Sequence, residues 1–263
     1  MVKRAVSIPR GFTILELVVV LAVLTALVAF LAPSAFQTIQ ASRENETEDQ
    51  LRAIFTAIRG EPSNGNYGYL GDMGRLPTSL DELVTQGTQT AWHTTSHQGG
   101  VGRGWRGPYI TRGDALSDLF RDAWGQTLSY SSSGGTAGQI TSYGPDGQAS
   151  TTGDNIVYPV QVPVQTTGTI LVTVIVNEIP QPAGLTVSVY STTNGDEGTA
   201  STQSTSGGSG VPFRFTVPHG TSTIVCTHTV STTTVTRTVT IDVAGGTQVS
   251  RTIIMKTSAT VSM

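Results

Sequence analysis

The sequence predicts an α+β protein with one long N-terminal helix, a small antiparallel sheet domain and, after it, an all-β sandwich. The first observation is an apolar run at residues 12–32 that continues as a helical pattern to residue 60. The second is the alternation of apolar and polar residues beyond residue 165, which is typical of strands. The 263 residues suffice for two globular parts, and the net charge of −3 gives no basic bias for binding nucleic acid.

Residues 12–32 are predicted to cross a membrane as a helix. Their length matches the ~20 apolar residues that span a ~30 Å hydrocarbon core. Lys3, Arg4 and Arg10 precede the run and would stay in the cytoplasm, so the body of the protein would face outward. Glu16 is the one charged residue inside the run, and a carboxylate at this depth is costly unless it has a partner.

The helix is predicted to continue beyond the membrane and to end near residue 60. Gly60 and Pro62 follow each other in the usual order for a helix C-terminus. Pro33 should kink or locally melt the helix, because proline removes one backbone hydrogen bond. Alternatively, Pro33 only marks the exit from the membrane. The second half of the helix carries an apolar stripe that would face a packed domain: Leu51, Ile54, Phe55 and Ile58.

The segment Arg10-Gly11-Phe12-Thr13-Ile14-Leu15-Glu16 resembles the class III signal of type IV pilins and type II secretion pseudopilins. The resemblance implies that a prepilin peptidase cuts between Gly11 and Phe12, removes residues 1–11 and methylates the new N-terminus at Phe12. Glu16 would then be the fifth residue of the mature pilin-type helix. The alternative is an ordinary secretory cleavage behind the apolar run, at residues 32–35.

Residues 61–158 are predicted to form a pseudopilin-like globular domain. This part of the chain resembles the major pseudopilin of type II secretion systems, because three of its segments occur in the same order as in that family. Ala123 stands where the family has a proline, Pro145 replaces a more flexible loop residue, and residues 86–104 look like an insertion. The three segments are Trp105-Arg106-Gly107-Pro108-Tyr109, Asp122-Ala123-Trp124-Gly125 and Ser142-Tyr143-Gly144-Pro145-Asp146-Gly147.

The resemblance also implies a structural calcium ion in the last of these loops. Calcium takes six to eight oxygen ligands on a tightly turning loop. Asp146, Asp154 and the amide oxygen of Asn155 could supply side-chain ligands, and Tyr143 or Ser142 could add main-chain oxygens. The family's extra acidic residue between the two acidic clusters is missing, and Asp-Gly is also an ordinary turn signal. A turn without metal is therefore the alternative.

Residues 165–263 are predicted to form the β-sandwich, joined through a proline-bounded linker at residues 159–164. The sandwich weakly resembles prealbumin-like and carboxypeptidase-regulatory-like modules, which implies display or contact. Cys226 falls on the apolar face of its strand and is expected to be a small core residue. The apolar positions of the predicted strands are Ile170, Val172, Val174, Val176, Leu185, Val187, Val189, Phe213, Phe215, Val217, Val235, Val239, Ile241 and Val243.

The sequence does not predict an enzyme. His93 and His97 have the spacing of zinc ligands on a helix, but they lie among Thr, Ser and Gly, and the catalytic glutamate of that motif is missing. Trp92, Trp105 and Trp124 are expected to pack in the core rather than to form a platform for sugar.

The expected function is therefore that of a homo-oligomeric helical filament subunit. The Glu16 carboxylate would neutralise the Phe12 amino group of a neighbouring copy, because an unpaired buried charge costs more than a paired one. The implied partners are the prepilin peptidase and an inner-membrane assembly platform with its ATPase. The protein would begin as a single-pass precursor in the bacterial inner membrane and become a periplasmic or extracellular filament. The alternatives are a major type IV pilin whose sandwich serves adhesion and a membrane-tethered adhesin that does not polymerise.

Overall fold

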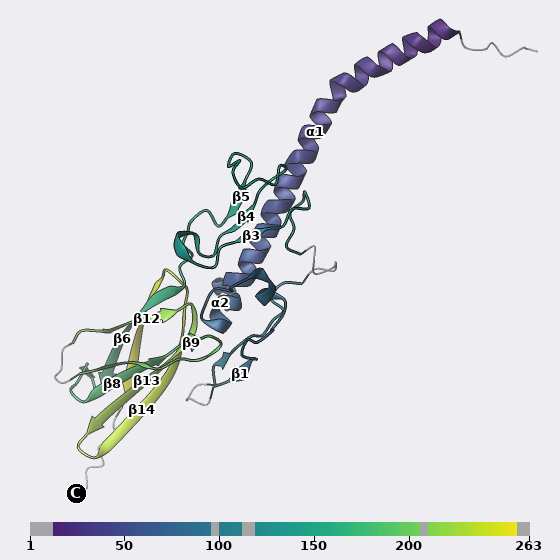
Figure 1. The fold of residues 1–263 in the computed structure, drawn as a ribbon. Coiled ribbons are helices and arrows are strands. Elements are labelled where there is room, and N and C mark those ends of the chain that lie inside the picture. Colours follow the sequence, from purple (N-terminus) through teal and green to yellow (C-terminus); the bar gives the residue numbers. More distant parts are fainter. Residues whose placement is uncertain (1–12, 96–99, 112–118, 206–209, 257–263) are drawn as a thin grey trace, which may run out of the picture. The chain divides into compact units, whose positions relative to one another are not determined.

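The computed structural model describes residues 13–95, 100–111, 119–205 and 210–256. It confirms the α+β class, with one long helix followed by small antiparallel sheets and a larger all-β region (Figure 1). The chain divides into two compact units, one that ends at Glu46 and one that begins at Thr47.

The first unit consists of the N-terminal part of helix α1, Ile14–Arg59. This helix is long and apolar enough to cross a membrane, and none of its most apolar window is buried within the structure. Large apolar side chains such as Leu17, Leu21 and Leu24 each expose about half of their surface. Because such a surface is unfavourable in water, it needs lipid or other helices to cover it.

The backbone of α1 stays helical through Pro33, so the helix does not melt there. Figure 1 shows that α1 bends within its N-terminal half, the half that contains this proline. A bend is the expected result of removing one hydrogen bond from an otherwise intact helix.

The second unit begins with a core built on the C-terminal part of α1. Leu51, Ile54 and Ile58 are fully buried there, which confirms the predicted stripe. A three-stranded antiparallel sheet in the order β3-β4-β5 contributes Ile140 to the same core. The elements of this domain are η1 (Pro62–Asn64), α2 (Gly68–Met73), η2 (Leu80–Leu83), β1 (His93–Thr94), β2 (Gly102–Arg103), β3 (Ser129–Tyr130), η4 (Gly134–Thr136), β4 (Ile140–Ser142) and β5 (Ile156–Tyr158).

Two facing sheets form the sandwich, one in the order β11-β8-β13-β14 and one in the order β12-β6-β15, with β7 paired to β6. A separate hairpin pairs β9 with β10. The strands are β6 (Thr167–Val176), β7 (Ile179–Pro180), β8 (Leu185–Tyr190), β9 (Thr192–Thr193), β10 (Asp196–Glu197), β11 (Ser201–Ser204), β12 (Phe213–Pro218), β13 (Gly220–Val230), β14 (Thr233–Val243) and β15 (Gln248–Met255).

The predicted alternation of the sandwich strands is confirmed, because the apolar positions of β6, β8 and β12 are buried and share one core. Cys226 is fully buried in this core, as expected, and burial raises the pKa of its thiol to about 12, so the thiolate is not available for reaction. The sandwich is not wholly antiparallel, because β15 pairs with β6 in parallel. The period-two pattern marks which face is buried but carries no information on strand direction.

The sandwich packs directly on the pseudopilin-like domain within the second unit. Residues 159–164, the predicted linker, contain no helix or strand, and Val164 is buried with its N–H donating to the carbonyl of Ala137 at 2.9 Å. Close backbone approaches occur between α2 and the sandwich. At Gly74, where φ is +70°, an added Cβ would lie 2.2 Å from the carbonyl oxygen of Thr192 in β9.

We therefore predict that Gly74→Ala destabilises the second unit more than Gly87→Ala. Both glycines have a left-handed backbone, with φ of +70° and +54°, but a Cβ at Gly87 would meet no atom within 4 Å. Both changes should cost about 1–2 kcal/mol of left-handed strain, and Gly74→Ala should cost about 1–3 kcal/mol more because of the overlap with Thr192. Denaturant unfolding of the two variants measures the difference. Equal losses would show that Thr192 does not constrain Gly74.

Candidate functional sites: assembly helix, calcium loop and interdomain pocket

The assembly residue Glu16 lies in the first turn of α1. Its backbone N–H donates to the Thr13 hydroxyl at 3.3 Å, which caps the helix start. A carboxylate is favourable near a helix N-terminus, where the backbone carries partial positive charge. The predicted processing residues Gly11 and Phe12 lie outside the described residues. The predicted pairing of Glu16 with a neighbouring chain stays a prediction.

The candidate calcium loop connects β4 to β5. Asp154 and Asn155 each hold a side-chain oxygen, Oδ1, that is buried and has no hydrogen-bond partner in the described structure. Burying such acceptors without a partner costs roughly 1–3 kcal/mol each. Asp154 folds back onto Gly144, where φ is +66° and an added Cβ would lie 2.5 Å from the Asp154 carbonyl oxygen. The two unpaired oxygens suit a hard cation such as calcium.

The other predicted ligands are less available in this structure. Asp146 is exposed, and its Oδ1 accepts the N–H of Gln148 at 2.8 Å. The Ser142 hydroxyl is buried and donates to Asp122 at 2.6 Å, so its main-chain oxygen and that of Tyr143 remain as candidates. In the described part of the chain, no group of three or more Asp, Glu, His or Cys residues could hold a metal ion. A calcium shell here would need amide and main-chain oxygens to complete it.

Asp122 is a residue that the sequence reasoning missed. Its carboxylate is almost fully buried, and Oδ1 accepts the N–H groups of Trp124 at 3.0 Å and Gln126 at 2.8 Å. Oδ2 accepts the Ser142 hydroxyl. Asp122 therefore connects its own turn to the start of the calcium loop. The only signal was its position at the head of the Asp122-Ala123-Trp124-Gly125 segment.

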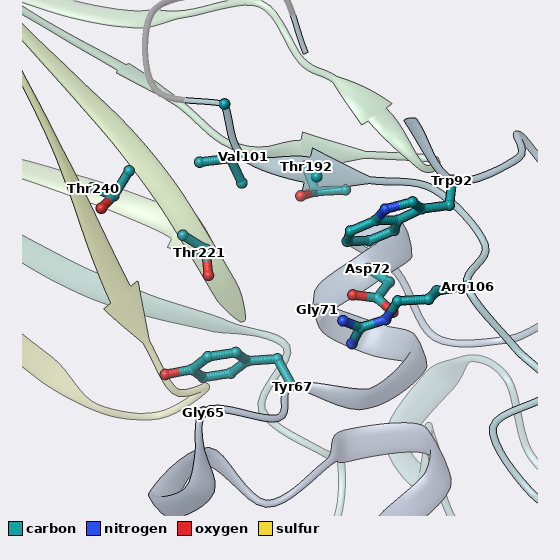
Figure 2. Close-up of a pocket in the computed structure, with 12 residues that line it drawn as sticks. Gly65, Tyr67, Gly71, Asp72, Trp92, Val101, Arg106, Thr192, Thr221 and Thr240 are labelled. Atoms are coloured by element: carbon teal, nitrogen blue, oxygen red, sulfur yellow. The ribbon is translucent and has the colours of Figure 1, made fainter. Parts of the chain in front are cut away.

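A pocket of about 290 Å³ lies between the pseudopilin-like domain and the sandwich. Figure 2 shows Trp92, Asp72 and Arg106 on one side of it, with Thr221 of β13 and Thr240 of β14 across from them. Tyr67 also lines the pocket, next to the start of α2.

Asp72 and Arg106 form the charged wall of this pocket. Asp72 Oδ2 accepts the Tyr109 hydroxyl at 3.0 Å and lies 3.2 Å from Arg106 Nε. Burial raises the pKa of the Asp72 carboxyl above its usual value, and the charge of Arg106 acts in the opposite direction. The Arg106 guanidinium lies over the Trp92 ring, 4.8 Å from its centroid, which is a cation–π contact.

The three tryptophans do not share one role. Trp105 packs against the helix core, as expected, and its indole N–H donates to the carbonyl of Glu82 at 2.7 Å. Trp92 instead remains 40% exposed and lines the pocket, so the expectation of a core position is wrong for this residue. His93 lies on a strand and faces Asp196 at 3.2 Å, and His97 lies outside the described residues.

His219 holds the end of α1 to the sandwich beside this pocket. Its Nε2 bonds to the carbonyl of Arg59, the last residue of α1, at 2.9 Å. Its Nδ1 accepts the N–H of Gly245 at 2.9 Å, which fixes the ring as the neutral tautomer with the proton on Nε2. Burial lowers the pKa of His219, and the positive charge of Arg59 acts in the same direction. The Tyr67 ring packs edge-on against this imidazole, with 5.2 Å between ring centroids.

These features define the class of protein. A long helix with an uncovered apolar N-terminal half and a C-terminal half packed under a small sheet is the arrangement of pilin-like proteins, as the sequence resemblance implied.

Known proteins similar to this chain agree with that class. Residues 35–158 match the family model of protein G of the type II secretion system. The type II secretion system core protein G of Xanthomonas campestris pv. campestris is 26% identical over 155 residues, which cover 56% of this chain and 91% of that protein. The predicted resemblance to the type II secretion pseudopilins is confirmed, and the similarity to protein G covers residues 35–158. The sandwich lies beyond the residues that match the family model.

We predict that acid weakens the second unit through His219. As the pH falls through the usual histidine value of about 6.5, the unfolded chain takes up a proton that the folded ring resists, so stability is lost toward low pH. Lowering the pH from 7.5 to 5.5 should cost roughly 1 kcal/mol through this residue. His219→Gln should be less stable at pH 7.5 but should lose that part of the pH dependence, measured by denaturant unfolding. A His219→Gln variant with the full wild-type pH dependence would contradict this prediction.

Proposed function

We propose that this protein is a structural subunit of a type II secretion pseudopilus or a closely related filament. The single observation that supports this most is the apolar half of α1, which carries one acidic residue and is left uncovered by the rest of the described chain. In a bilayer, lipid would cover this surface before assembly. In a filament, other copies of the same helix would cover it.

The proposed assembly step depends on Glu16. Cleavage by a prepilin peptidase between Gly11 and Phe12 would place a methylated ammonium group at the start of the apolar helix. The carboxylate of Glu16 in one copy could pair with that ammonium group in the next. Since an unpaired charge in an apolar medium is costly and a paired one much less so, neutralisation would favour helices that pack at one fixed stagger.

The work of assembly would come from partners in the inner membrane. An assembly platform and its ATPase would extract the single-pass precursor from the membrane, and the globular parts would coat the periplasmic filament. We assign no catalytic step to the chain itself, in keeping with its relative, which is a core protein of the type II secretion system.

A second candidate is a surface pilin whose sandwich mediates adhesion. The sandwich favours this alternative because it lies outside the family match. It is also fixed to the pseudopilin-like domain by backbone approaches and by His219, so its outer strands would be displayed in one orientation along a filament. A membrane-tethered adhesin that never polymerises is the remaining alternative.

We also propose that the loop between β4 and β5 holds a structural calcium ion. The residues fit, because the buried oxygens of Asp154 and Asn155 have no partner in the described structure and a cation would satisfy both. Asp146 and the main-chain oxygens of Ser142 or Tyr143 would complete the shell. When bound, calcium would neutralise the loop carboxylates and hold β4 and β5 together at the end where the loop joins them.

We predict that Glu16→Ala abolishes filaments in cells that carry the assembly machinery. The variant keeps the apolar helix but lacks the carboxylate that would neutralise the neighbouring amino group. Electron microscopy of sheared surface and periplasmic material counts the filaments, and mass spectrometry of the N-terminal peptide tests for a methylated Phe12.

The matched control is Glu44→Ala, at an exposed glutamate of the same helix outside the apolar run, which should leave filament number unchanged. A Glu16→Ala protein that still assembles, or a functional protein that begins at Met1, contradicts the proposal. Activity retained by single, unassembled chains would favour the tethered adhesin.

For the calcium loop, we predict that a chelator lowers the Tm of the wild-type protein by roughly 5 °C, because a ligand that binds only the folded state stabilises it. Asp154→Asn should have a lower Tm in calcium and little further response to the chelator. Asp81→Asn, at an exposed aspartate outside the loop, should respond like the wild type. A wild-type Tm that is the same with and without chelator indicates a turn that needs no metal.

A further inference from the structure

The pocket between the two domains has the size of a site for one small ligand. Its volume of about 290 Å³ lies near the lower end of the ~300–1,000 Å³ that is usual for small-molecule sites. Gly71 and Tyr67 line it from the pseudopilin-like domain, and Thr221 and Thr240 line it from the sandwich. The site is complete only when both domains are present.

The charges around the pocket favour a neutral ligand. The Asp72 carboxylate and the Arg106 guanidinium neutralise each other at 3.2 Å. On the opposite wall the Thr221 hydroxyl donates to Asp242 at 2.6 Å, which adds a negative charge nearby. An anionic ligand would therefore meet no unpaired cation. Asp242 is exposed, so water screens its charge, while the half-exposed guanidinium of Arg106 at the pocket would repel a cationic ligand.

The polar groups of the pocket fit a ligand with several hydroxyl groups. Tyr109 and Arg106 both bond to Asp72 Oδ2, which leaves Oδ1 as an acceptor for a ligand hydroxyl. Arg106 bonds through Nε, and its two terminal nitrogens remain as donors. Across the pocket, the exposed Thr240 side chain can both donate and accept.

The aromatic groups supply the apolar part of such a site. The Trp92 indole is held by the guanidinium of Arg106 and remains 40% exposed, and the Tyr67 ring is braced by His219. Rings fixed in this way can pack against the C–H groups of a ligand at little entropic cost. Aromatic rings together with a carboxylate, a guanidinium and hydroxyl groups form a pocket suited to a compact ligand that has C–H faces and many hydroxyls.

We propose that this pocket binds a neutral saccharide unit, as a free sugar or as the end of a glycan chain. The proposal does not rest on the assembly function, because the pocket lies in the second unit and Glu16 in the first. It gives the added sandwich a role, since the sandwich provides one wall of the site.

The test is calorimetric titration of the full-length protein in lipid nanodiscs. Alkyl glycoside detergents are avoided because their sugar head groups would compete. The neutral probes are glucose, galactose, mannose and N-acetylglucosamine, and the charged comparators are glucuronate and glucosamine. We expect saturable binding of at least one neutral sugar with a Kd of roughly 1 mM or tighter, and weaker binding of its charged counterparts.

Substitutions of residues that line the pocket test whether the sugar binds there. Asp72→Asn should weaken binding at least tenfold, and Thr240→Val should weaken it several-fold. Thr236→Val is the matched control, because it makes the same change at another exposed threonine of β14 outside the pocket. If Asp72→Asn does not fold, as judged by circular dichroism, Thr240→Val decides, since it alters an exposed side chain of an edge strand.

Three outcomes would overturn the proposal. The first is that no neutral sugar of the panel binds, and the second is that a charged comparator binds more tightly than every neutral sugar. The third is that Thr240→Val and Thr236→Val bind sugar equally well. Filament assembly by Thr240→Val should be normal, so failure of the saccharide site can be distinguished from failure of the assembly proposal.

Discussion

The apolar surface of α1 is the constraint on which the rest of this molecule depends. The apolar surface of the second half of the helix is covered within the chain, because Leu51, Ile54 and Ile58 lie inside a packed domain. The first half has no such cover in the described structure, and in the proposed function lipid or other copies would supply it. In the proposed filament, Glu16 would favour other copies over lipid, since lipid alone leaves a carboxylate without a partner while a neighbouring amino terminus would neutralise it. The division of the chain into two units follows the same boundary between uncovered and covered helix.

The second unit is one compact unit, although its sequence predicts two domains and a linker. Gly74 and Gly220 allow backbone to meet backbone between α2 and the sandwich, and no side chain fits in either place. His219 joins the last carbonyl of α1 to the loop before β15 through a neutral ring. These contacts would pass a force on the sandwich to the helix, and they also create the pocket between the domains. The sandwich therefore enlarges the surface of the pseudopilin-like domain and also adds a pocket that neither domain forms alone.

Features that follow from local sequence patterns were predictable, whereas features that depend on contacts between distant segments were not. Three predictable features were the buried stripe of α1, the end of the helix at Gly60 and the buried position of Cys226. Each depends only on the spacing of nearby apolar residues or on the properties of a single residue. The bracing role of Asp122 was not predictable, since its partner Ser142 lies on another strand. The exposure of Trp92 was also missed, because it depends on where Arg106 places its guanidinium.

By itself, the sequence determined the membrane-length helix, the class of the protein and which faces of the sandwich strands are buried. Hydrophobic period and a short terminal motif are local properties, so they can be read without knowing which segments meet. Only the tertiary structure decided that β15 runs parallel to β6, that Asp154 and Asn155 hold buried oxygens without partners, and that Asp72, Arg106 and Thr240 face one pocket. These features arise from contacts between residues far apart in the chain, and such contacts are fixed by packing rather than by local pattern.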